Sequence, residues 1–239
     1  ASAEKGLEIA SEADSRDKGF GDSTAQITMI LMDKYGQSTE RAIRNRTFEV
    51  DNEGDKSLVI FDSPGDVRGT AFLSHTKKAD SDNQWLYLPA LKRVKRIASS
   101  NKAGPFMGSE FSYEDIASQE VEKYTYNYLR DEELNGLDCF VIEYDPVDPK
   151  SGYTRQIVWM DTAEYRVLKI DFYDRKDTLL KTLTYENYNQ YLGKFWRSNR
   201  LVMVNHQTDK KTVLVFADWK FQTGMTERDF EKSALKRTR

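Results

Sequence analysis

The chain has 239 residues and a net charge of -3, with 31% charged and 12% aromatic residues. This aromatic content argues against a disordered chain, because disordered segments lack the large apolar side chains that form a core. The negative net charge gives no reason to expect a nucleic-acid partner. No apolar run approaches the roughly 20 residues that a membrane-spanning helix requires. We expect a single domain over residues 1–239, large enough to bury a core without disulfide or metal.

The N-terminal segment, about residues 2–17, has the spacing of an amphipathic helix. Ala3, Leu7 and Ala10 recur at helical intervals, and no proline interrupts them. Glycines within residues 19–22 then break the pattern, and the period changes to two. We therefore predict one helix followed by strands.

The rest of the chain has the alternation of short antiparallel strands separated by turns. The strongest hairpin signal is Asn135-Gly136, since this dipeptide suits the tight primed turns. The strand candidates are AQITMILMD, RAIRNRTFEVD, KSLVIFDSP, RGTAFLSHT, QWLYLPA, KRVKRIAS, VEKYTYNYLRD, LDCFVIEY, RQIVWMD, RVLKIDFYD, TLLKTLTYENY, FWRSNRLVMVN and KTVLVFADWKF. We predict a mainly β fold, in which one strongly curved antiparallel sheet of about eleven strands closes around a space, with the helices on its concave side.

One predicted strand, near residue 86, has large apolar groups on both faces. Trp85 and Tyr87 alternate with Leu86 and Leu88, a pattern expected when each face of a strand is covered. One of these faces is therefore expected to meet something other than the ordinary core.

A lid segment, about residues 101–117, follows these strands. Its apolar side chains Phe106, Met107, Phe111 and Tyr113 lie among glycines, and Ser109 or Ser112 can cap a short helix there. Adaptable apolar groups beside hinge residues suit a movable gate over a cavity. A fixed hydrophobic plug between the sheet and a covering helix predicts the same residues, so both interpretations stay open.

Five cations cluster beside the aromatic strand. They are Lys92, Arg93, Lys95, Arg96 and Lys102. Such a cluster suits phosphate, a phospholipid headgroup or an acidic partner. An ordinary solvated face is the alternative, and a nucleic-acid contact is disfavoured by the acidic remainder of the chain.

No residue pattern indicates catalysis. His75 and His206 lie far apart without a motif, and Cys139 stands alone in an alternating strand. The local motifs of zinc hydrolases, serine hydrolases and nucleotide-binding proteins are absent from the sequence. We predict no enzyme activity, no catalytic residue, no metal and no cofactor. A hydrolase with a convergent site around either histidine remains a rival hypothesis.

Four segments carry a resemblance to a known family. They are SLVIFDSPGDVRGTAFLSH (57–75), WLYLPALKRVKRI (85–97), FMGSEFSYEDI (106–116) and TERDFEKSALKR (226–237). With matching length and strand order, they make nearly the whole chain resemble the periplasmic lipoprotein carrier superfamily (LolA-like), and more closely its branch of outer-membrane lipoprotein-sorting proteins. The resemblance implies an open, incomplete β-barrel whose short helices form a lid over an apolar cavity for acyl chains.

The resemblance also implies a function without covalent chemistry. We expect a noncatalytic carrier or chaperone that binds the acyl chains of a lipoprotein or lipid for transport to the outer membrane. The cavity candidates are Leu58, Ile60, Phe72, Trp85, Tyr87, Phe106, Met107, Phe111 and Tyr113, and the headgroup or partner candidates are Lys92, Arg93, Lys95, Arg96 and Lys102.

The expected location is the periplasm of a Gram-negative bacterium, with the signal peptide already removed. The small residues Ala1-Ser2-Ala3 suit a cleavage site, although a cloning remnant looks the same. The implied partners are an inner-membrane exporter, an outer-membrane acceptor and a transient membrane surface, and the expected state is a monomer. The alternative is an accessory protein-binding scaffold for an envelope exporter of the RND type.

Overall fold

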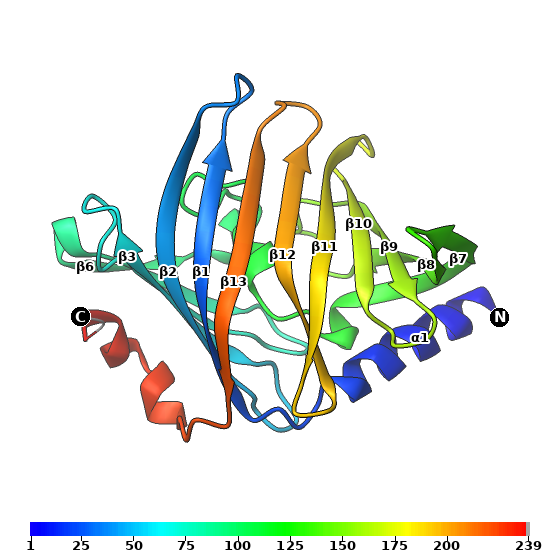
Figure 1. The fold of residues 1–239 in the computed structure, drawn as a ribbon, viewed down its shortest axis with the longest axis horizontal. Coiled ribbons are helices and arrows are strands. Elements are labelled where there is room, and N and C mark those ends of the chain that lie inside the picture. The colour runs from blue at the N-terminus through cyan, green and yellow to red at the C-terminus, as the bar shows by residue number, and fades with distance from the viewer. Residues whose placement is uncertain (238–239) are drawn as a thin grey trace.

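The computed structural model describes residues 1–237 and consists of one curved antiparallel sheet with helices packed against it (Figure 1). The strands are β1 (Asp22–Met32), β2 (Ser38–Phe48), β3 (Lys56–Ser63), β4 (Ala71–His75), β5 (Asn83–Leu88), β6 (Arg93–Ile97), β7 (Tyr124–Leu134), β8 (Leu137–Pro146), β9 (Arg155–Asp161), β10 (Val167–Tyr173), β11 (Leu179–Tyr191), β12 (Phe195–Asn205) and β13 (Lys211–Phe221). The helical elements are α1 (Ser2–Arg16), α2 (Tyr113–Ile116) and the 3-10 turns η1 (Pro89–Leu91), η2 (Ser99–Asn101), η3 (Val121–Lys123), η4 (Glu227–Phe230) and η5 (Lys232–Lys236).

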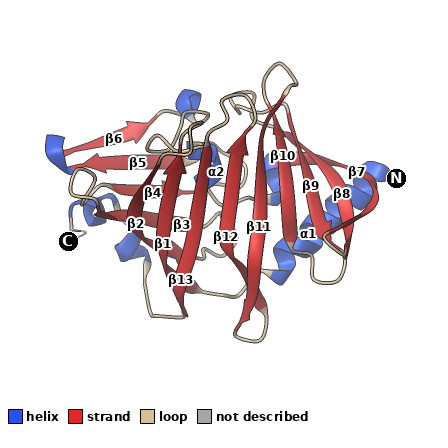
Figure 2. Ribbon diagram, turned by 45° about the horizontal axis from the view of Figure 1, so that its top comes forward, coloured by secondary structure: helices blue, strands red, loops and turns tan. Residues whose placement is uncertain are grey.

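The strand order explains why the sheet stays open. It runs β6-β5-β4-β3-β2-β1-β13-β12-β11-β10-β9-β8-β7, so the first strand pairs with the last, and β6 and β7 form the two edges. These edge strands are consecutive in the chain but do not pair. Residues 98–123, which we call the crossing segment, therefore run from one edge to the other. The sheet face that carries the crossing segment and α1 is the inner face, and the opposite side is the outer face (Figure 2).

The fold class and the local elements follow the sequence prediction closely. The sheet has 13 strands, more than the total of about eleven expected, and each segment named from its alternation corresponds to one of them. The predicted helix is α1, and the Asn135-Gly136 turn has the two positive φ angles, 53° and 79°, of a primed hairpin. The short helix α2 begins after Ser112, whose N–H donates to the Asp115 carboxylate at 2.7 Å.

Strands β3 to β5 are covered on both faces, as predicted for the aromatic strand. On the outer face, Phe230 and Leu235 of the C-terminal turns are fully buried in a cluster that includes Leu58. Trp85 and Tyr87 pack against the same cluster. The second layer is therefore the C-terminal end of the chain itself.

Helix α1 packs on the inner face at the opposite edge of the sheet. Ile9 and Ala10 are buried against Tyr126, Ile142 and Met160 of β7 to β9. The approach is close, because a Cβ at Gly6 would lie 3.0 Å from that of Tyr126. None of the helices in residues 1–237 has the length and apolar character needed to cross a membrane.

Candidate functional site

A cavity of about 910 Å³ lies between α1 and the inner face of the strands near β7. The strand residues that line it come from β7 to β12. Much of the remaining wall comes from α1 and the residues that follow it, from residues 49–55 after β2, and from residues 114–121 of the crossing segment; the β9–β10 and β11–β12 turns also contribute to it. This volume lies within the range of small-molecule and lipid-sized pockets.

The floor of the cavity is aliphatic and aromatic. It is formed by Val158, Met160, Ile170, Phe172, Leu183, Tyr124, Tyr126, Tyr144, Tyr185 and Tyr188. The Tyr126 and Tyr144 rings meet edge to face, with centroids 4.7 Å apart. Burial raises the pKa of Tyr144 and of Tyr185, so both phenols stay neutral at physiological pH. The floor is thus an uncharged surface that offers phenol hydroxyls.

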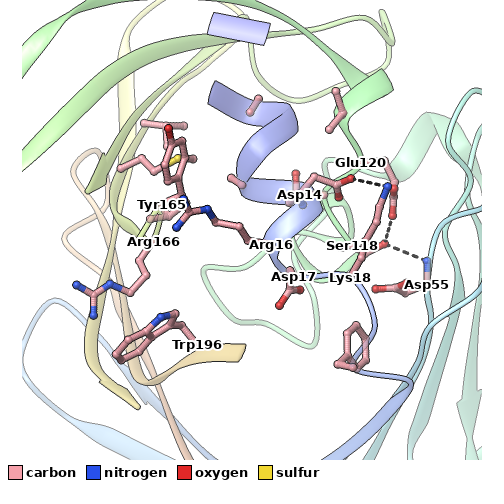
Figure 3. Close-up of a pocket in the computed structure, with 18 of the residues that line it drawn as sticks. Asp14, Arg16, Asp17, Lys18, Asp55, Ser118, Glu120, Tyr165, Arg166 and Trp196 are labelled. Carbon is pink, nitrogen blue, oxygen red and sulfur yellow. Dashed lines mark hydrogen bonds and ion pairs between the residues drawn. The ribbon is translucent and has the colours of Figure 1, made fainter. Parts of the chain in front are cut away.

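The rim of the cavity is charged, and acidic side chains outnumber basic ones there. One side of the rim gathers Asp14, Glu120 and Asp55 (Figure 3). Lys18 Nζ lies 3.2 Å from Asp14, and Ser118 Oγ donates to Glu120 at 2.9 Å. The other side carries Arg16, Tyr165, Arg166 and Trp196 (Figure 3).

Burial perturbs the carboxyl groups of the acidic side. It raises the pKa of Asp55 to about 7, with further contributions from Glu120 and Glu49. Burial also raises the pKa of Glu120. Since a raised carboxyl pKa means that the charged form is disfavoured, this side loses part of its negative charge near neutral pH.

Cations stack on aromatic rings along the opposite side of the rim. The Arg16 guanidinium lies 4.4 Å from the centroid of the Tyr165 ring, and that of Arg166 lies 4.5 Å from the Trp196 ring. Arg166 Nε also donates to the buried Asp161 carboxylate at 2.9 Å. These contacts hold the aromatic rings in place beside the opening.

The apolar part of the crossing segment lies beside the cavity, in a core cluster that covers the inner face of β1 to β6 and extends to residues of β10 to β13. Phe106 is 1% exposed, and its ring lies 5.1 Å from that of Phe72 and 5.9 Å from that of Phe61. The strands hold this segment from several directions. Lys181 Nζ donates to the Asp115 carboxylate at 2.7 Å, in an ion pair whose side chains are only 6% and 7% exposed.

Other contacts hold the backbone of the same segment. Arg41 Nη1 donates to the Met107 carbonyl at 2.5 Å, Lys181 Nζ to the Glu110 carbonyl at 2.9 Å, and the Glu110 N–H donates to Thr212 Oγ1 at 3.0 Å. These contacts favour a fixed plug over a movable gate, and we call residues 106–116 the plug.

The structure separates the nine predicted cavity residues into two groups. The inner core around the plug contains the first group: Phe72, Phe106, Phe111 and Tyr113, with Met107 at its margin. The second group lies on the outer face, beneath the C-terminal turns, and consists of Leu58, Ile60, Trp85 and Tyr87. None of the nine lines the 910 Å³ cavity. That these residues contact lipid stays a prediction. The cavity itself lies between α1 and strands β7 to β12.

The predicted basic cluster also divides. Four of the cations lie on the β5–β6 hairpin: Lys92 in its turn, Arg93 and Lys95 on the inner face of β6, and Arg96 on the outer face. Lys102 instead forms an ion pair with Asp148 at 3.0 Å and lines a separate pocket of about 310 Å³.

One feature of the sequence does indicate this cavity. Tyr124, Tyr126 and Tyr128 recur at every second position, and such spacing places three phenols on one face of β7. An aromatic face that keeps hydroxyls is typical of a half-wet surface. The rim was harder to predict, because its charges come from segments far apart in the chain.

The two histidines do not meet. His75 Nε2 lies 2.6 Å from the Phe230 carbonyl oxygen, and His206 Nε2 lies 2.7 Å from Thr182 Oγ1. Neither histidine lines the cavity. Within residues 1–237, no group of three or more histidine, cysteine or acidic side chains is arranged to hold a metal ion.

Comparisons with known proteins place this geometry in a family. A crystal structure of a domain from Vibrio parahaemolyticus, provisionally described as an outer membrane lipoprotein-sorting protein domain, is 58% identical, with a TM-score of 0.97 over 98% of this chain and 99% of that one. The chain belongs to the outer membrane lipoprotein-sorting protein family. A family model described only as an uncharacterized protein matches residues 53–237. The predicted resemblance is therefore confirmed.

Two further structures share the fold of this lipoprotein-sorting family. A DUF1329 family protein from Desulfovibrio piger is 29% identical, with a TM-score of 0.93 over 98% of this chain and 99% of that one. A LolA superfamily protein from Nitrosomonas europaea is 21% identical, with a TM-score of 0.77 over 96% and 98% of the two chains. No curated protein is similar enough to this chain to count as a match.

Proposed function

We propose that this protein is a noncatalytic periplasmic carrier that encloses acyl chains of a lipoprotein or lipid in the cavity between α1 and the sheet. The observation that carries the proposal is the uncharged floor of a 910 Å³ cavity in a member of the lipoprotein-sorting family. Transport toward the outer membrane is the part of the proposal that the description of the Vibrio relative supports.

The energetics favour such a ligand without covalent chemistry. Each methylene group removed from water contributes about 0.8 kcal/mol, so partial enclosure of an acyl chain offsets much of the cost of leaving a membrane. The floor offers aliphatic contacts at Ile170 and Leu183 and aromatic contacts at Tyr144 and Tyr185. The charged rim keeps the opening hydrated, which suits a ligand whose polar end stays outside.

The first test is recovery of the cargo. The protein, produced with its export signal and purified without detergent, is analysed by native mass spectrometry and by solvent extraction. A carrier retains stoichiometric lipid or lipopeptide. A protein that stays empty, also after incubation with envelope lipids, contradicts the proposal.

A matched pair of variants locates the bound ligand. Ile170→Asp places a charge on the cavity floor, where the side chain is only partly buried. Val215→Asp makes the same kind of change at a side chain that is 37% exposed and does not line the cavity. We expect Ile170→Asp to lower lipid retention at least tenfold and Val215→Asp to leave it unchanged.

The scaffold for an RND-type exporter remains the second candidate, and the filled half of the inner face favours it. A plug of buried phenyl rings gives a docking module a filled core that needs no bound ligand. The two functions differ in their need for cargo. A scaffold captures its exporter equally well as wild type and as Ile170→Asp, whereas a carrier transfers lipid only when the cavity is intact.

A further inference from the structure

The β5–β6 hairpin projects a hydrophobic side chain within a group of cations. Leu91, in the turn η1, is 66% exposed. Lys92, Arg93, Lys95 and Arg96 follow it, and all four are exposed. A single exposed leucine is common on protein surfaces. A leucine followed directly by cations forms a segment with the composition of a surface that enters a membrane interface.

The four cations lack acidic partners. Within residues 1–237, no carboxylate lies within ion-pair distance of Lys92, Arg93, Lys95 or Arg96, although ion pairs occur elsewhere on the sheet, for example between Arg44 and Asp62 at 2.9 Å. Arg96 Nη2 donates to the amide oxygen of Asn83 at 2.7 Å, a neutral partner. The positive charge of the hairpin is therefore not neutralised by the protein itself.

The hairpin is held rigidly. Lys92 adopts φ 48°, in the left-handed region, and its N–H donates to the Pro89 carbonyl at 3.1 Å to close the turn. Pro89 packs on the β3–β4 loop, where a Cβ at Gly69 would lie 3.2 Å from it. On the outer face, Val94 belongs to the cluster beneath the C-terminal turns. The cations are thus presented on a fixed element, which lowers the entropy lost on binding.

The hairpin lies at one end of the molecule, and α1 lies at the other. Figures 1 and 2 both place β6 and the C-terminus at the opposite end of the long axis from α1 and the N-terminus. Since α1 forms a wall of the cavity, contact through the hairpin leaves the cavity rim free.

We propose that the β5–β6 hairpin docks the protein on an anionic phospholipid bilayer. Lys92, Arg93, Lys95 and Arg96 meet lipid phosphates, and Leu91 inserts among the headgroups. A bilayer fits better than an acidic protein, because Leu91 protrudes instead of lining a groove, and a single apolar tip beside unpaired cations matches a surface that is anionic outside and apolar beneath. This docking is independent of cargo binding.

The test is flotation of the full chain with vesicles that contain phosphatidylglycerol, compared with vesicles of phosphatidylcholine alone. We expect binding only to the anionic vesicles, and release at high salt because exposed charges are then screened. Lys92→Gln/Lys95→Gln is expected to weaken binding roughly 30-fold, given the known contribution of each cation near an anionic surface. Leu91→Asp is expected to weaken it at least tenfold.

Matched controls separate the hairpin from net charge. Lys176→Gln/Lys210→Gln removes two cations from exposed turns elsewhere, and Leu192→Asp changes a side chain that is 56% exposed on the β11–β12 hairpin. Both are expected to bind vesicles within about twofold of wild type. Equal losses in the hairpin and control variants overturn the proposal. Absence of vesicle binding, with or without capture of an acidic protein by the hairpin, also overturns it.

Discussion

The two halves of the inner face use the same sheet in opposite ways. Against β1 to β6, the crossing segment inserts Phe106 between Phe61 and Phe72, and the space is filled. Against β7 to β12, helix α1 covers only part of the face, and 910 Å³ stays open. One half of the open sheet therefore has a filled core, and the other half keeps the space that we propose for a ligand.

The side-chain chemistry of the two halves matches this division. The filled half is packed mainly with phenyl and aliphatic groups around Phe106, and the buried Lys181–Asp115 pair satisfies charge at its border. The open half contains tyrosines, whose rings offer an apolar surface while their hydroxyls tolerate water. A cavity lined in this way can be wet when empty without a large cost from exposed hydrocarbon.

The largest expected effect is on the stability of the filled half. Phe106→Ala removes a fully buried ring and is expected to lower the free energy of unfolding by about 3–5 kcal/mol. Tyr185→Ala, in the open half, is expected to cost about 1 kcal/mol, because its side chain already borders a cavity. Urea unfolding of both variants measures the contrast, and equal losses would contradict the division into filled and open halves.

The next effect concerns the ion pair that holds the plug. Lys181→Met leaves the Asp115 carboxylate buried without its cation, so we expect a loss of about 3 kcal/mol and faster amide exchange over residues 106–116. Lys169→Met is the control, since Lys169 lies 3.8 Å from Asp171 and is 30% exposed. Its loss should stay below about 1 kcal/mol. A plug unaffected by Lys181→Met would mean that the ion pair does not hold it.

A smaller effect is expected when the open half is narrowed from the helix side. Ala13 lines the cavity, and Ala13→Trp should lower the affinity for lipid about tenfold by occupying the space of several methylene groups. Glu12→Trp places the same ring one residue away, on the exposed side of α1. It should bind lipid as wild type does. Titration with a fluorescent fatty acid distinguishes the two variants.

The smallest effect is a pH dependence at the rim. The pKa of Asp55 is raised from 3.8 to about 7, so between these values the folded state holds a proton that the unfolded state has released. Stability therefore falls as pH rises from about 4 to 7. Asp55→Asn should stabilise the protein by on the order of 1 kcal/mol at pH 8, after allowance for solvent screening, and by nothing below pH 4. A pH-independent difference between the two proteins would refute this assignment.

Local features of the fold were predictable because they depend on neighbours in the chain. The Asn135-Gly136 hairpin and helix α1 follow from turn chemistry and from periodicity over a few residues. The two covered faces of β5 were also predictable, since Trp85 and Leu86 point to opposite sides of the strand. The identity of the covering layer was not predictable, because Phe230 reaches this strand from the far end of the chain.

The site was less predictable than the fold for a related reason. Alternation shows that Leu58 and Val59 face opposite sides of β3, but it does not tell which side is the inner one. Leu58 and Ile60, which were predicted as cavity candidates, lie on the outer face. The segment around Phe106 has the composition expected of a gate. Only its contacts with Lys181 and Arg41 show that it is held in place.

The most direct test of the account is photo-crosslinking with a lipid that carries a diazirine on its acyl chain, followed by peptide mapping. We expect labels on α1 and on β9 to β11, around Met160 and Ile170. Labels on the plug around Phe106, or on the outer face around Leu58, would show that acyl chains enter elsewhere and would contradict the assignment of the cavity as the binding site.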